Sequence, residues 1–196
     1  MEQRFPGFDV LAQARLWDPV TAGVVLARLG PPPPIRFFTP PEEGIARPLL
    51  DLLLDDPGDV PVLAMIDSRL AEASTDGWRY DDLPEDGQAW RDSLAALDAD
   101  AHDKCGVGFA ACDQQAQLVQ AVQDLGGGAW HGMPAGHVWS LWTRYACTAF
   151  YSHPHAWQEI GFGGPAYPRG YKNIGVDRRE PWEVTDHHAT DPVRPS

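Results

Sequence analysis

Positive charge is scarce in this sequence. Its 196 residues include 15 Lys and Arg against 28 Asp and Glu, which gives a formal net charge of −13 at pH 7. Proteins that bind nucleic acid need clusters of Lys and Arg to neutralise phosphates, and anionic membrane surfaces attract polybasic segments. The charge therefore argues against nucleic acid and against an anionic membrane surface as partners, while it says little about the fold.

Long apolar runs and paired cysteines are also missing. No stretch approaches the ~20 apolar residues of a transmembrane helix, so we expect no membrane insertion. The amino terminus has no basic region followed by an apolar one, which predicts a cytoplasmic protein unless a partner carries it out. Cys105, Cys112 and Cys147 form no CxxC pair, and their odd number argues against a disulfide framework. We expect reduced, buried thiols, with one bond between Cys105 and Cys112 left open.

The usual signatures of catalysis and nucleotide binding are absent too. The sequence has no GxSxG elbow. Gly106 and Gly108 lack the third glycine and the preceding strand of a dinucleotide fingerprint, and the triple glycine 126–128 follows a helical pattern with no GK[ST] behind it. We therefore expect no cofactor on this chain and no catalytic residues in it.

Helical periodicity is the dominant pattern that is present. Apolar residues recur at helical spacing in five segments, while no alternating run of useful length occurs after the first forty residues. These patterns predict an all-α protein, a small helical bundle. The predicted helices cover approximately residues 39–54, 60–73, 85–102, 114–125 and 135–151.

Glycine and proline, 19 of each, predict irregular segments around this bundle. We expect an extended arm over residues 1–40, which contains the four prolines 31–34 and in which residues 20–29 could form a short helix or strand. A helical domain over 41–171 and a polar tail over 172–196 complete the predicted organisation. Trp182 is the one anchor expected in that tail.

Aromatic residues gather in one stretch, FYSHPHAWQEIGFGGPAYPRGY, residues 150–171. We call it the aromatic arm. Its prolines and glycines prevent regular structure beyond a short helical turn at 156–160, so its rings cannot all face inward from one helix. Either the arm pins itself to its own core, or it docks on a partner. The candidate partner-binding residues are Trp157, Phe162, Tyr167, Arg169, Tyr171 and Trp182.

The same arm contains the best candidate ligands for a metal ion. His155 and Glu159 are four residues apart on one helical turn, and His153 lies two residues before. Such a set arises often by chance, and Pro154 holds the two histidines awkwardly. We therefore expect His153 and His155 to cap the helix break and to bond to the backbone, with a stand-alone metal enzyme as the alternative.

The aromatic arm also resembles the signature of the gluconate 2-dehydrogenase subunit 3 family. The stretch LLDLLLDDPGDVPVLAMIDSRL at 49–70, the segment GWRYDDLP and the run LAALDADA are similar as well, so the resemblance spans roughly residues 40–182. Members are small helical subunits that accompany a larger flavoprotein of the glucose-methanol-choline oxidoreductase superfamily. Many members carry an export signal, which this amino terminus lacks.

The resemblance implies a function that the residues alone do not give. This chain would be a non-catalytic small subunit that binds and stabilises an FAD-dependent oxidoreductase acting on a sugar or alcohol, with FAD on the larger subunit. A chaperone that escorts the flavoprotein and then leaves it is a second possibility.

Overall fold

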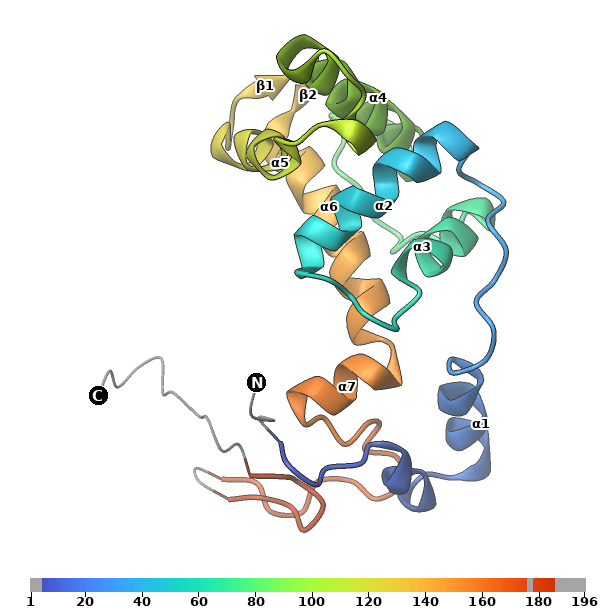
Figure 1. The fold of residues 1–196 in the computed structure, drawn as a ribbon. Helices are drawn as coiled ribbons and strands as arrows, with labels where there is room; N and C mark the ends of the chain where they lie inside the picture. The colour runs from blue at the N-terminus through green and yellow to red at the C-terminus, as the bar shows by residue number, and fades with distance from the viewer. Residues whose placement is uncertain (1–4, 176–177, 186–196) are drawn as a thin grey trace, which may run out of the picture. The chain divides into compact units, whose positions relative to one another are not determined.

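The computed structural model describes residues 5–175 and 178–185. These residues are almost entirely helical or irregular, and the only strands among them form a two-residue hairpin, so the all-α prediction is confirmed (Figure 1). In that hairpin β1 (Ala129–Trp130) pairs antiparallel with β2 (Met133–Pro134). The polar tail predicted over 172–196 lies outside the described residues at positions 176–177 and 186–196.

The chain divides into two compact units. The central unit is residues 32–150, and the terminal unit combines residues 1–31 with residues 151–196. This division differs from the expected sequence of arm, helical domain and tail. Residues 5–31 do not stand apart as an extended arm, because they share a core and hydrogen bonds with the aromatic arm.

The central unit contains the predicted bundle. Its elements are α2 (Pro40–Leu54), α3 (Val62–Ala71), α4 (Asp86–Cys105), η2 (Phe109–Ala111), α5 (Gln115–Asp124), the hairpin and α6 (Ala135–Tyr151). The first turn of α2 is closed by Glu42, whose carboxylate accepts a hydrogen bond from the Thr39 N–H at 2.8 Å. Each predicted helix is therefore present, with ends displaced by a few residues at most.

Large side chains fill the core of the central unit. Leu49, Trp90, Leu94, Phe109 and Trp142 are fully buried. The indole N–H of Trp142 donates to the Ser93 hydroxyl at 2.9 Å, so this polar group is satisfied inside the core.

A buried carboxylate holds the segment that leads into α2. Asp67 is fully buried on α3, and it accepts the backbone N–H groups of Arg36, Phe37 and Phe38 at 2.7, 2.9 and 2.9 Å. Three amide donors compensate the cost of burying this charge. One residue of α3 thus binds three consecutive backbone amides of the segment after the four prolines.

The terminal unit contains η1 (Leu11–Leu16), α1 (Pro19–Ala27) and α7 (Pro154–Ile160). Helix α1 covers most of the segment 20–29, for which either a short helix or a strand was predicted. Asp18 caps it, accepting the N–H groups of Val20 and Thr21 at 2.9 and 3.1 Å, and Pro19 occupies its first turn. Both features favour a helix start, and they settle the open choice between helix and strand at 20–29.

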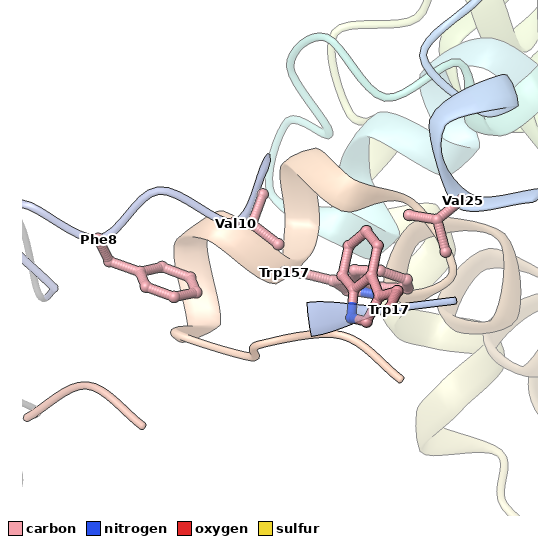
Figure 2. Packing of buried hydrophobic residues seen from close by; sticks show 5 residues of the cluster. All are labelled: Phe8, Val10, Trp17, Val25 and Trp157. Atoms are coloured by element: carbon pink, nitrogen blue, oxygen red, sulfur yellow. The ribbon is translucent and has the colours of Figure 1, made fainter. Parts of the chain in front are cut away.

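A small core joins the two segments of the terminal unit (Figure 2). Trp17 and Trp157 meet edge to face, with ring centroids 6.5 Å apart. The side chain of Gln158 adds a polar link, because its Oε1 accepts the Val10 N–H at 2.9 Å and its Nε2 donates to the Phe8 carbonyl. The cluster consists of Phe8, Val10, Trp17, Val25 and Trp157.

Candidate docking site

His153 begins the structured part of the aromatic arm. It is buried and is the N-cap of α7, where its Nδ1 accepts the His155 N–H at 3.2 Å. Its Nε2 lies 2.9 Å from the Arg28 carbonyl and donates to it. One ring nitrogen accepts and the other donates, so the ring is the neutral Nε2–H tautomer. Burial lowers the pKa of His153, which reinforces the neutral form. This is the capping role expected of it.

The other two candidate metal ligands are turned to solvent. His155 and Glu159 are both exposed. The rings of His153 and His155 lie 4.8 Å apart at their centroids, but among the described residues no ligand atoms of His153, His155 and Glu159 gather within 4.8 Å of one another. His153 is therefore a helix cap, while His155 and Glu159 are surface side chains.

A different cluster of ligand-type residues is present in the central unit. Cys105, Cys112 and Asp113 bring one ligand atom each within 4.8 Å. However, Cys105 and Cys112 are joined by a disulfide, so neither sulfur is a thiolate that could bind a metal. The bond between Cys105 and Cys112 that the sequence left open is therefore present, and the expected reduced thiols are not found for this pair. It is also wrong to place Cys147 in the core, because this residue lies on the exposed side of α6.

Trp157 is the buried member of the predicted docking set. It is only 5% exposed, and its indole N–H donates to the Tyr151 carbonyl at 2.6 Å. Gly164, where φ is +73°, leaves room for Trp17, which packs against Trp157. A Cβ atom at Gly164 would lie 2.4 Å from the Trp17 ring. Trp157 therefore belongs to the small core and supports the surface without forming it.

The next aromatic residues lie on the surface. Tyr167 is 70% exposed, and Phe162 and Tyr171 are also exposed. Phe162 contacts Trp157 edge to face at 5.4 Å, and Tyr171 lies 6.3 Å from Trp182. Ile174, which the sequence patterns did not single out, is 85% exposed. Phe162 thus rests on the small core, and Tyr167, Tyr171 and Ile174 present further apolar side chains to solvent.

Arg169 and Trp182 connect the aromatic arm to the segment after it. The Arg169 guanidinium lies over the Trp182 ring at 4.5 Å from its centroid, and its Nη2 donates to the Gly163 carbonyl at 2.9 Å. Burial lowers the pKa of Arg169, although it stays far above neutrality for any guanidinium. Trp182 is half-buried, as its expected role of anchor requires.

Helix α1 is a part of the surface that the sequence analysis missed. Its sequence PVTAGVVLA has no polar face, and within it only Val25 is buried. Val20, Val24 and Leu26 are exposed. A helix that is apolar on all sides is normally covered, so this one is unusual on a free surface. The continuous apolar run directly after a capping Asp-Pro pair was the available signal.

Exposed apolar side chains are concentrated in the terminal unit. Among the described residues, ten of the fourteen exposed large hydrophobic side chains belong to it, although it is the smaller unit. The ten are Leu11, Val20, Val24, Leu26, Tyr151, Ile160, Phe162, Tyr167, Tyr171 and Ile174.

The negative charge is concentrated in the other unit. Residues 32–150 contain 7 Lys and Arg against 19 Asp and Glu, a net charge of −12, whereas the remaining residues contain 8 against 9, a net charge of −1. The terminal unit is thus nearly neutral and apolar on its surface, which is the composition expected of a protein interface.

Comparison with known proteins gives one match. The family model described as Gluconate 2-dehydrogenase subunit 3 matches residues 44–164. No curated protein and no solved structure matches. Within the described residues, no helix is both long enough and apolar enough to cross a membrane.

Proposed function

Because this chain belongs to the gluconate 2-dehydrogenase subunit 3 family, whose members are small subunits of a dehydrogenase complex, we propose that it is non-catalytic and that it binds and stabilises a larger flavoprotein. The proposed partner is an FAD-dependent oxidoreductase of the glucose-methanol-choline type that oxidises a sugar or a related alcohol. FAD is proposed to lie on that partner, because the chain lacks a dinucleotide-binding motif.

The observation that carries this proposal is the apolar surface of the terminal unit. Exposed apolar patches usually mark interaction sites, and aromatic residues and arginine dominate the energy of interfaces. The terminal unit presents Phe162, Tyr167 and Tyr171 on a nearly neutral surface. It also presents the apolar helix α1. A flavoprotein that covers this surface would remove it from water, which stabilises both proteins in the complex.

The structure separates the residues that can test docking from those that would unfold the unit. Tyr167 and Ile174 are largely exposed, so their truncation should leave the free chain intact. Trp157 is buried, and Arg169 bonds to a backbone carbonyl, so changing either one would also alter stability.

The test measures the affinity of the chain for its co-expressed flavoprotein and the thermal midpoint of the free chain. We expect Tyr167→Ala to weaken binding by about 30- to 1,000-fold, which corresponds to about 2–4 kcal/mol for a central interface ring. The thermal midpoint of the free chain should change little. Leu52→Ala is the matched control, because Leu52 is an exposed apolar residue of the central unit.

Two results would contradict the proposal. Unchanged affinity in Tyr167→Ala and in Ile174→Ala would show that the partner does not use this surface. A wild-type chain that copurifies with no flavoprotein would remove the proposed function itself. A transient escort, in contrast, would bind the flavoprotein before FAD is inserted and leave the finished enzyme, so affinity for the FAD-free and FAD-loaded partner distinguishes the two roles.

A further inference from the structure

Buried polar atoms without hydrogen-bond partners gather in the terminal unit. Five such side-chain atoms occur among the described residues, and four of them belong to Gln13, Trp17 and Arg169. Buried polar groups in folded proteins are nearly always bonded, so each exception needs an explanation. Three unpaired side chains in one small unit, one of them charged, point to a missing ligand.

Arg169 is the charged member of this set. Its Nη2 is bonded to the Gly163 carbonyl, while its Nε and Nη1 are buried and have no partner. Glu183 is the acidic side chain whose charge acts on it, but Glu183 Oε2 already accepts the Glu180 N–H at 2.6 Å. The guanidinium therefore has two nitrogens, with three N–H groups, that lack an acceptor, and it has no paired carboxylate.

The surroundings of Arg169 hold it in place. A Cβ atom at Gly163 would lie 3.2 Å from Arg169 Nη2, 3.4 Å from Trp182 Cδ1 and 3.9 Å from Gln13 Oε1. Glycine at this position thus allows the guanidinium, the indole and the amide to come together. Gln13 Oε1 is a buried acceptor without a partner near this guanidinium.

A cavity of about 310 Å³ reaches the side chains that surround the guanidinium. Gln13 and Trp182 line it, together with Arg15, the apolar side chains of Leu16 and Val184, and Glu183. Arg169 itself does not line the cavity, but two residues beside its guanidinium, Gln13 and Trp182, do.

We propose that Arg169 receives a carboxylate side chain of the flavoprotein partner, which enters through this cavity. The inference rests on the proposed function and adds the chemistry of the contact. An acidic side chain is the anion that a protein partner can supply, and a planar guanidinium bonds a carboxylate more strongly than neutral groups. Arg15 adds a second positive charge at the wall.

The experiment compares Arg169→Lys with Arg169→Met in the complex. Both variants lose the planar fork, whereas only Arg169→Lys keeps the positive charge. We expect Arg169→Met to bind the co-expressed flavoprotein about 30-fold more weakly than wild type, or weaker still. Arg169→Lys should bind about tenfold more tightly than Arg169→Met, and added NaCl should reduce that difference.

Controls separate this inference from the proposed function. Arg47→Met removes an exposed arginine of the central unit and should leave affinity unchanged. Equal affinities of the Lys and Met variants, with Tyr167→Ala still weakened, would overturn the inference and leave the docking surface standing. If deletion of residues 186–196 abolished the difference between the Lys and Met variants, the carboxylate would come from this chain, which would also overturn the inference.

Discussion

At the scale of single residues, His153 shows how burial assigns a chemical role. A histidine beside a second histidine and a glutamate suggests a metal site from sequence alone. In the structure both ring nitrogens of His153 are occupied by backbone groups, one as acceptor and one as donor. A protonated ring could not accept the His155 N–H. The fold of α7 therefore depends on a neutral His153, and this dependence can be measured.

The pH dependence of stability should report this residue. The pKa of His153 is lowered in the folded chain, so the unfolded chain binds the proton more readily below about pH 6.5. The contribution of His153 is therefore fully present above that pH and is lost as the pH falls toward the folded pKa. We expect the thermal midpoint of the terminal unit to fall between pH 7.5 and pH 5.5.

His155 provides the control for this prediction. It is exposed and lies two residues after His153 in the sequence. Unfolding is measured by tryptophan fluorescence, because Trp17 and Trp157 are in the core of the terminal unit. His153→Gln should flatten the pH dependence, and His155→Gln should retain it. An identical slope in both variants would show that another group titrates in this range.

At the scale of elements, α1 shows what sequence patterns cannot decide. The residues of α1 predict neither an inward nor an outward face, because apolar side chains surround the whole helix. The cap at Asp18 fixes where the helix starts, while the position of Trp17 and Trp157 decides that Val25 is the side chain that faces inward. That choice depends on a contact with a segment more than 120 residues away.

Charge placed on the outer side of α1 should therefore affect binding and spare the fold. Val24 is exposed, so we expect Val24→Lys to change the thermal midpoint of the free chain little. The affinity for the flavoprotein should fall about tenfold or more, because a charge would then be buried at the interface. Val25→Lys is the control: Val25 is 3% exposed, and this change should unfold the terminal unit. Undiminished affinity in Val24→Lys would place α1 outside the interface.

The helical body was predictable from sequence, while the small core was not. Helical spacing predicts α2 to α6, because each helix buries one stripe against near neighbours. The core of Trp17 and Trp157 joins residues far apart in the chain, and no local pattern reports such a contact. The aromatic residues of the arm can be read from the sequence. Which of them is buried, as Trp157 is, and which is exposed, as Tyr167 is, depends on contacts with distant residues and cannot be read from it.

At the scale of the whole molecule, the two units differ in net charge and in exposed apolar surface. The central unit is acidic and well packed, and it supplies solubility. The terminal unit has little net charge and much of the exposed apolar surface. We therefore expect a partner protein to cover the terminal unit. We also expect that partner to bind any cofactor.

The isolated chain should therefore carry no flavin. Purified alone, it is expected to be colourless in the flavin region at roughly 350–500 nm, because we propose that the flavin is bound by the partner. The measurement is an absorbance spectrum of the separated subunits of the complex. The flavoprotein should keep the yellow chromophore, and a stoichiometric chromophore on this chain would contradict the assignment of FAD to the partner.

The two-segment construction of the terminal unit also has a consequence for biosynthesis. Residues 32–150 form a continuous unit that can fold while the ribosome is still at work, since domains generally fold as units during synthesis. The core around Trp17 must wait until Trp157 has emerged, so Phe8, Val10 and Trp17 remain without their packing partners for most of translation. The proposed docking surface is consequently the last part to fold, and the proposed flavoprotein partner would bind only chains whose synthesis has passed the aromatic arm.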